Sequence, residues 1–310
     1  MDRLITVLKK VGNPSVVGLD PKSQILPQQL TQVESVQQLA QSYLDFNRSI
    51  IDAVTGLVAV VKPQIAMYEA MGPVGLEVYC KTTAYASSKG LYVLGDVKRG
   101  DIGTTAAAYA SHLAGSPAVG DLETEDLWHE DAITVNPFLG YDGIRPFLQA
   151  AEKADKDIFV LCSTSNPSSS QLQALPCGPD GMTVSQHLAE LIELWGQDSR
   201  GGCGFSRIGA VVGATHPDQA SDLRARLPHT FLLVPGYGAQ GGTAADVAAL
   251  FTDNSSYGAS ISSSRGIIAA WQKDPSYRPD MSRTQALDLV AKAARKAARQ
   301  MRDDLTAVLN

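Results

Sequence analysis

The 310-residue sequence contains few cysteines, and none of them is spaced to bind a metal or to form a redox pair. Cys80, Cys162, Cys177 and Cys203 are scattered, with no C-x-x-C motif, which excludes an obvious zinc or dithiol site. Such sparse use of cysteine is typical of a reduced, cytoplasmic chain. The five histidines are equally dispersed and lack H-E-x-x-H spacing, so we expect no bound metal.

Long apolar runs and basic clusters are also missing. No apolar run approaches the roughly 18 residues that a membrane-spanning helix needs, and the first ten residues lack the apolar core of a signal peptide. The net charge is −6, from 26 Lys+Arg and 32 Asp+Glu, without a basic stripe. The sequence therefore predicts neither a membrane nor a nucleic-acid partner.

Short apolar segments alternate with helical patterns along the whole chain. Near-continuous apolar strands are typical of a parallel sheet that is covered on both faces. Eight such units in about 300 residues predict an α/β protein with one (β/α)8 TIM-barrel domain over residues 1–310. A doubly wound sheet is the alternative, but no G-x-G-x-x-G follows the first strand. We expect strands at residues 16–20, 57–62, 91–94, 132–136, 157–162, 208–213, 231–234 and 257–262.

Two stretches interrupt this alternation. Residues near 115–130 are acidic, and residues near 166–182 are rich in Ser, Gly and Pro. Both compositions favour loops over packed elements. We therefore expect two insertions that leave the chain a single domain.

A group of charges follows the third apolar strand. Asp96 and Lys98 share one face where the strand is expected to end, and Asp101 lies on the following turn. Thr104 or Thr105 is expected to cap the next helix. A solvated charged turn is the alternative interpretation, but these charges close an apolar strand. The pattern predicts a lysine held between carboxylates, which favour its charged form.

Polar residues also follow the other strands of the predicted barrel. Chemistry in barrels of this class takes place at the carboxyl ends of the strands, so these residues are expected to meet at one rim. Glycine-rich loops that carry an arginine or an amide after the last two strands are typical of a phosphate site. The rim therefore predicts a phosphorylated substrate, and its candidate residues are Asp20, Lys62, Asp96, Lys98, Ser163, Thr164, Ser165, Gln240 and Arg265.

Six segments, in chain order, carry a family resemblance. They are VGLDP at 17–21, VKPQIAMYE at 61–69, GDVKRGDIG at 95–103, TSNP at 164–167, PGYGAQGG at 235–242 and SRGI at 264–267. Together they resemble the orotidine 5′-monophosphate (OMP) decarboxylase family in its longer subgroup. The resemblance implies a cofactor-free homodimer that converts OMP into UMP and CO₂ in de novo pyrimidine synthesis.

The resemblance also implies residue roles. It places an alternating Lys-Asp-Lys-Asp network on Lys62, Asp96, Lys98 and Asp101, with Lys98 stabilising and protonating the C6 carbanion. Asp101 reaches the neighbouring subunit's site, and two further residues accompany it. The implied substrate-binding residues are Ile102 and Thr105 beside Asp101, Asp20 at the ribose, Ser165 at the pyrimidine (with Ser163 and Thr164 as alternatives), and Pro235, Gln240 and Arg265 in the last two loops.

Other classes of protein fit part of this pattern. A Mg²⁺-dependent sugar-phosphate decarboxylase or aldolase could use D-x-K-x-x-D to hold its metal, but this leaves the cation of Lys62 unexplained. A Schiff-base aldolase could act through Lys98 or Lys62. A non-catalytic nucleotide-phosphate binding protein is the alternative from another class, and the intact Lys98 with both aspartates speaks against it.

Overall fold

The computed structural model describes residues 1–121, 124–214, 217–238, 241–251 and 257–309. Its eight parallel strands pair in chain order, and β8 pairs with β1 to close the barrel. The predicted (β/α)8 barrel is therefore confirmed, and the doubly wound alternative is wrong. The strands are β1 Ser15–Leu19, β2 Val60–Pro63, β3 Tyr92–Arg99, β4 Ala132–Val135, β5 Asp157–Ser163, β6 Ile208–Val212, β7 Leu232–Pro235 and β8 Ala259–Ser263.

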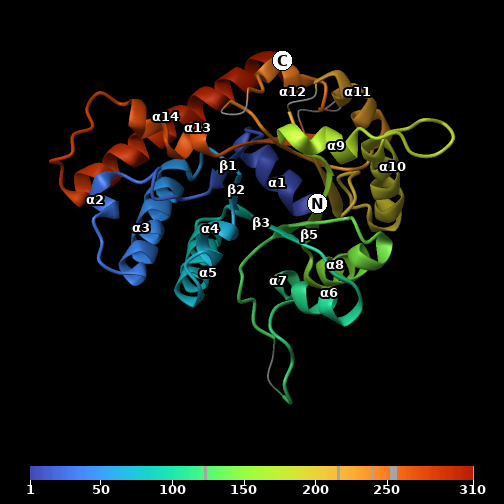
Figure 1. The fold of residues 1–310 in the computed structure, drawn as a ribbon, viewed down its shortest axis with the longest axis horizontal. Helices are drawn as coiled ribbons and strands as arrows, with labels where there is room; N and C mark the ends of the chain where they lie inside the picture. Colours follow the sequence, from blue (N-terminus) through green and yellow to red (C-terminus); the bar gives the residue numbers. More distant parts are fainter. Residues whose placement is uncertain (122–123, 215–216, 239–240, 252–256, 310) are drawn as a thin grey trace.

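Helices surround the barrel and connect its strands (Figure 1). Local signals explain several of their ends: the Ser35 side chain caps α3, Thr183 and Gln186 form a capping box on α10, and Gly12 ends α1 in a left-handed conformation. The α-helices are α1 Asp2–Val11, α2 Gln28–Thr31, α3 Val36–Val54, α4 Ala66–Glu69, α5 Pro73–Ser88, α6 Gly103–Tyr109, α7 Ser111–Ala114, α8 Tyr141–Ala154, α9 Ser170–Gln173, α10 Val184–Gly196, α11 Pro217–Arg226, α12 Ala244–Ala248, α13 Arg265–Ile268 and α14 Arg283–Leu309. Short 3₁₀ turns lie at Pro167–Ser169, Gln197–Ser199 and Ala270–Lys273.

Two apolar cores stabilise this arrangement. One fills the space between the strands and the outer helices, and the other fills the barrel itself. Leu4 and Leu8 of α1 belong to the inner core together with Tyr92, Leu94 and Phe159, so α1 closes the barrel at the amino ends of its strands. Since side chains alternate along a strand, Asp96 continues the inward-facing series of Tyr92 and Leu94. The inward-facing side chains of β3 therefore change from apolar to charged toward the carboxyl end of the barrel.

Two expectations for the third unit are wrong. Strand β3 does not end at residue 94 but continues to Arg99, so Asp96 and Lys98 belong to the strand. Helix α6 begins at Gly103 after Ile102, without a side-chain cap, so neither threonine caps it. Pairing with the neighbouring strands supplies the hydrogen bonds that extend β3 through charged residues, and a propensity argument does not include this pairing.

The two expected insertions differ in local structure. The segment between α7 and β4 projects from the barrel (Figure 1), and within it the Ser116 N–H donates to the Glu125 carbonyl at 2.8 Å. The segment after β5 contains the 3₁₀ turn at Pro167–Ser169 and helix α9. No helix among the described residues is both long and apolar enough to cross a bilayer.

The outer face of β3 packs against a buried carboxylate. Glu130 is fully buried, accepts a hydrogen bond from the Tyr79 hydroxyl, and pairs with His112 Nδ1 at 2.7 Å. The ring of His112 stacks on Trp128 at 4.1 Å between centroids. A Cβ on Gly95 would lie only 2.0 Å from Glu130 Oε1. Glycine at position 95 is therefore required for β3 to approach this cluster.

We predict that Gly95→Ala lowers the free energy of unfolding by about 1–3 kcal/mol or more, because the added methyl group would clash with the buried Glu130 carboxylate. Urea denaturation measures the change. Gly202→Ala is the matched control, since its Cβ would meet Asp2 Oδ2 at 3.7 Å, an ordinary contact. Equal stability of the two variants would contradict the prediction.

Candidate active site

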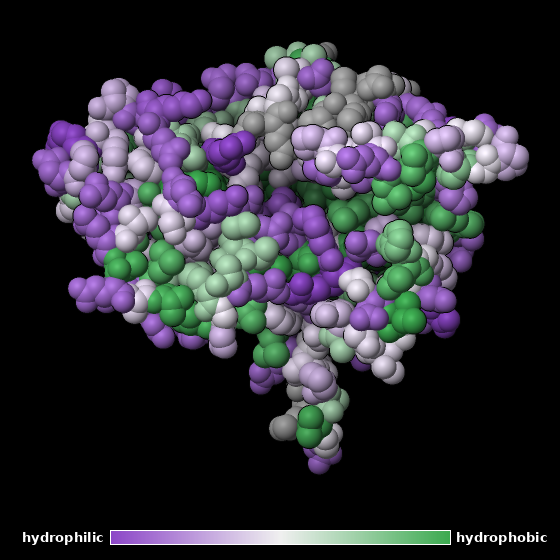
Figure 2. All heavy atoms as spheres, in the orientation of Figure 1, coloured by the Kyte–Doolittle hydropathy of each residue, from purple (hydrophilic) through white to green (hydrophobic). Residues whose placement is uncertain are grey.

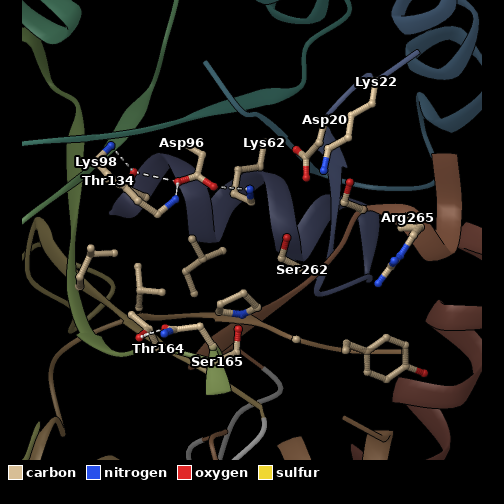
Figure 3. A pocket seen from close by; sticks show the side chains of 18 of the residues that line it. Asp20, Lys22, Lys62, Asp96, Lys98, Thr134, Thr164, Ser165, Ser262 and Arg265 are labelled. Carbon is tan, nitrogen blue, oxygen red and sulfur yellow. Dashed lines mark hydrogen bonds and ion pairs between the residues drawn. The ribbon is translucent and has the colours of Figure 1, made fainter. Parts of the chain in front are cut away.

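A cavity of about 610 Å³ opens at the carboxyl ends of the strands. Figure 2 shows a hydrophilic hollow at the centre of this face, and Figure 3 shows its charged side chains. Lys98, Asp96 and Lys62 lie in a row at one end, Arg265 lies at the opposite end, and Asp20 lies between them (Figure 3). The polar and charged lining residues are Asp20, Lys22, Lys62, Asp96, Lys98, Thr134, Thr164, Ser165, Asn166, Tyr237, Ser262, Ser264 and Arg265.

Asp96 is the centre of the hydrogen-bond network in this cavity. Its Oδ2 accepts from Lys62 Nζ at 2.6 Å and from Gln64 Nε2 at 3.0 Å. Its Oδ1 accepts from Lys98 Nζ and, at 3.0 Å, from Thr134 Oγ1. Four donors from β2, β3, β4 and the residue after β2 therefore hold one carboxylate in a single orientation.

The charges in this network stabilise one another. Burial by itself would raise the pKa of Asp96, but the ammonium groups of Lys62 and Lys98 outweigh it and hold that pKa well below its usual range. Burial opposes the charged form of Lys62 as well, yet Asp96, followed by Asp20, raises the pKa of this lysine above its ordinary value. Lys62 and Asp96 are therefore both ionised although they are buried.

The other predicted binding residues surround the remaining cavity. Ser165 and Pro235 line it, as does Arg265 at the start of α13. The Oδ1 atom of Asp20 is buried, and no described residue donates a hydrogen bond to it. Such an acceptor is suited to a hydroxyl of a bound ligand, since a buried polar atom without a partner is costly. Gln240 lies outside the described residues.

Three predicted residues do not line the cavity of their own chain. Asp101, Ile102 and Thr105 are absent from its lining. Asp101 Oδ1 instead accepts a hydrogen bond from the Ile102 N–H at 2.8 Å, and the Ile102 side chain is exposed. Among the described residues, the Lys98 ammonium forms an ion pair with Asp96 alone, so the chain by itself does not hold this lysine between two carboxylates.

The structure adds residues that the sequence did not single out. Gln64 and Thr134 contact Asp96, and Lys22 and Tyr237 line the cavity. Gln64 lies inside the segment at 61–69 that carries the family resemblance, so the sequence could have identified it as a candidate site residue. Thr134 carries no signal in the sequence, because a threonine in an apolar strand is ordinary.

The donor chemistry of the site is unsuited to a divalent metal. Among the described residues, no group of three or more His, Cys, Asp and Glu side chains is arranged to hold one. Both oxygens of Asp96 accept hydrogen bonds from lysine ammonium groups. A cation placed at Asp96 would therefore be repelled by two adjacent positive charges.

The closed barrel and the charged cavity at the carboxyl ends of its strands place the chain among the (β/α)8-barrel enzymes. A family model, orotidine 5′-phosphate decarboxylase / HUMPS, matches residues 15–278. The chain belongs to this family.

Relatives and solved structures agree with this assignment. An orotidine 5′-phosphate decarboxylase of Rhodopirellula baltica is 41% identical over 275 residues, which cover 88% of this chain and 89% of that protein. One of Petrotoga mobilis is 39% identical over 306 residues, which cover 98% of this chain and 97% of that protein. The crystal structure of a putative orotidine 5′-phosphate decarboxylase from Streptomyces avermitilis superposes with a TM-score of 0.77 at 30% identity, covering 99% and 95% of the two chains.

We predict that Asp96→Asn lowers the free energy of unfolding by about 3–5 kcal/mol at pH 7, because it removes the carboxylate that accepts a hydrogen bond from the buried Lys62 ammonium. Because the pKa of Asp96 is lowered in the folded state, its charge stabilises the fold above the unfolded-state pKa of about 3.9. This stabilisation is lost as the pH falls toward the folded-state pKa. The difference in free energy of unfolding between wild type and Asp96→Asn should therefore become smaller below about pH 3.9, by up to about 1.4 kcal/mol per pH unit.

Urea denaturation at pH 7, 4 and 2.5 measures this gap. Asp280→Asn is the control, because Asp280 forms an exposed ion pair with Arg278 and its loss should cost less than about 0.5 kcal/mol. A gap that stays constant across the three pH values would show that the Asp96 charge is not the cause.

Proposed function

We propose that this chain is an orotidine 5′-monophosphate decarboxylase, which converts OMP into UMP and CO₂ in pyrimidine biosynthesis. The observation that carries this proposal is the Lys62–Asp96–Lys98 network in the barrel cavity of a chain that belongs to this family. The relatives that bear this name match almost the full length of the chain. The residue roles below are part of the proposal.

The chemistry requires a fixed cation at the reacting carbon. When the bond from C6 to the carboxylate breaks, CO₂ leaves and the electron pair stays on C6, in an orbital orthogonal to the π system of the ring. No cofactor is needed if an ammonium group stabilises this charge as it develops. Lys98 has this role and then donates a proton to C6, after which solvent reprotonates the amine. Asp96 orients this ammonium group through their ion pair, and Lys62 in turn holds Asp96 in place.

Substrate binding takes place along the remaining cavity. Arg265, with its guanidinium fork, binds the phosphate together with Gln240, and Pro235, the last residue of β7, lines the same cavity. Asp20 accepts hydrogen bonds from ribose hydroxyls through its open Oδ1, and Ser165 contacts the pyrimidine. Contacts to the distant phosphate contribute to catalysis because they fix the reacting ring in a cavity from which water is removed.

The active form is a homodimer with shared sites in this proposal. Asp101, Ile102 and Thr105 do not line their own chain's cavity, so they are available to a second subunit. Apolar side chains near this region are exposed, with Ile102 at 53% and Phe138 at 80%. Burial of such a surface favours association. Asp101 of one subunit would then approach Lys98 of the other and supply the second carboxylate.

The chain acts as one catalytic domain over residues 1–310, with the segments near 115–130 and 166–182 as insertions. We place the enzyme in the cytoplasm, because its four cysteines are free in the structure and the disulfide-poor composition suits a reducing compartment. OMP is its only proposed partner apart from the second subunit, with no nucleic acid, membrane, metal or cofactor.

An absorbance assay with OMP, with and without EDTA, tests the function. We expect turnover that EDTA does not change. Loss of activity in EDTA would support the Mg²⁺-dependent relative, and trapping of a covalent adduct by borohydride would support a Schiff-base aldolase. Binding of UMP without any turnover of OMP would identify a non-catalytic binding protein.

We predict that Lys98→Ala loses at least about 100-fold in kcat, because the ammonium acts on the transition state, while UMP binding is retained. Steady-state kinetics and calorimetric titration of UMP measure the two effects. Lys81→Ala is the control, since Lys81 pairs with Glu77 on the surface. More than a tenth of the wild-type activity in Lys98→Ala would refute the assigned role.

We predict that Lys98→Ala and Asp101→Ala proteins, each inactive alone, regain activity when mixed. Random exchange of subunits in a two-fold dimer gives one intact site in half of the dimers, so recovery should reach up to about a quarter of wild-type activity. Fluorescently labelled subunits show independently whether exchange occurs. Exchange without recovery would remove the shared-site proposal.

A further inference from the structure

Strand β3 contains a bulge at the lysine of the network. Gly95 pairs with Ile133 and Arg99 pairs with Val135, so the three residues Asp96 to Lys98 face the single residue Thr134 on β4. Lys98 has a φ of 45°, in the left-handed region that side chains other than glycine rarely adopt. Such a conformation persists only where the surrounding structure holds it.

The Thr134 hydroxyl spans this bulge. It accepts a hydrogen bond from the Lys98 backbone N–H at 2.9 Å and donates one to Asp96 Oδ1 at 3.0 Å. Thr134 is buried, with 1% of its surface exposed, so water does not compete for these bonds. A hydroxyl has one proton and two lone pairs, which is sufficient for both contacts. One side chain therefore fixes both the strained backbone of Lys98 and the carboxylate that orients its ammonium.

The strand is held on both sides of the bulge. Before it, the Asp131 N–H donates to the Val93 carbonyl at 2.7 Å, and beyond it the Asn136 N–H donates to the Arg99 carbonyl at 2.8 Å. These bonds fix where β3 enters and leaves the bulge. Inside the bulge, the hydroxyl of Thr134 replaces a strand carbonyl as the acceptor for Lys98 N–H.

We propose that Thr134 is a positioning residue for the decarboxylation: its hydroxyl holds the Lys98 bulge in the one conformation that aims the ammonium at the reacting carbon. The inference rests on the proposed function and extends it to a side chain outside the charged network. Asp20 follows β1 and Arg265 begins α13, so neither is part of β3 or β4, and loss of this hydroxyl should disturb the chemical step and leave substrate binding intact.

Thr134→Val tests this proposal because valine keeps the shape of threonine and can neither accept nor donate a hydrogen bond. We expect kcat for OMP to fall about 100-fold, as for a misplaced catalytic group, with KM changed by less than about threefold and UMP affinity unchanged. Thr134→Ser restores the hydroxyl and should recover at least about a third of the wild-type kcat.

Thr82→Val is the matched control. Thr82 is also fully buried, and its hydroxyl donates to the Val78 carbonyl of its own helix at 2.8 Å. It undergoes the same atomic change, but its hydroxyl donates within its own helix and not to Asp96, so its kcat should equal that of wild type. A loss of kcat in Thr134→Val beyond that of Thr82→Val separates positioning from a general effect on stability.

Several results would overturn the proposal. These are a wild-type kcat in Thr134→Val, an equally low kcat in Thr134→Ser, or a loss that appears in KM alone. If Thr134→Val does not fold, Thr134→Ala is compared with Thr134→Ser under the same criteria. Turnover of OMP by the wild type is measured first, because its absence would overturn the proposed function, whereas an active wild type and an equally active Thr134→Val would overturn the role of Thr134 alone.

Discussion

The buried ion pair between Lys62 and Asp96 is the contact on which the rest of the cavity depends. Its 2.6 Å separation joins β2 to β3, and neither side chain has more than a small fraction of its surface in water. A buried charge is tolerated only beside an opposite charge with its remaining hydrogen bonds satisfied. Gln64 and Thr134 complete those bonds. The pair therefore fixes two strands relative to each other and holds the second lysine, Lys98, beside it.

The barrel separates this charge from the part of the protein that supplies stability. Apolar residues fill the barrel toward the amino ends of the strands, where helix α1 closes it. Toward the carboxyl ends, the inward-facing side chains of β3 change from Leu94 to Asp96. Because the floor is apolar and packed, the charges above it lie in a medium where their attraction is stronger than in water. The strain at Lys98 is stored in this rigid setting, at the point where the proposed chemistry needs a single orientation.

The described residues that line the cavity carry more positive than negative charges. Lys22, Lys62, Lys98 and Arg265 line it against the two carboxylates of Asp20 and Asp96. This balance suits a substrate that carries both a phosphate and a carboxylate, and a third acid donated by a second subunit would offset part of the remaining excess at Lys98. The separation of Arg265 from Lys98 along the cavity (Figure 3) allows one molecule to contact both ends, and in the proposed binding mode the phosphate and the reacting ring therefore contact different residues.

The sequence by itself determined the alternation of strands and helices, the rim of polar strand ends, and the charged side chains Lys62, Asp96 and Lys98, because burial and periodicity are written locally in the chain. Only the tertiary structure decided that β3 runs through Asp96 to Arg99 with a bulge, that Thr134 spans it, and that Asp101 lies outside its own cavity. These features depend on the register between neighbouring strands and on the direction of loops. Register is set by contacts between residues far apart in sequence, and a local pattern does not encode it.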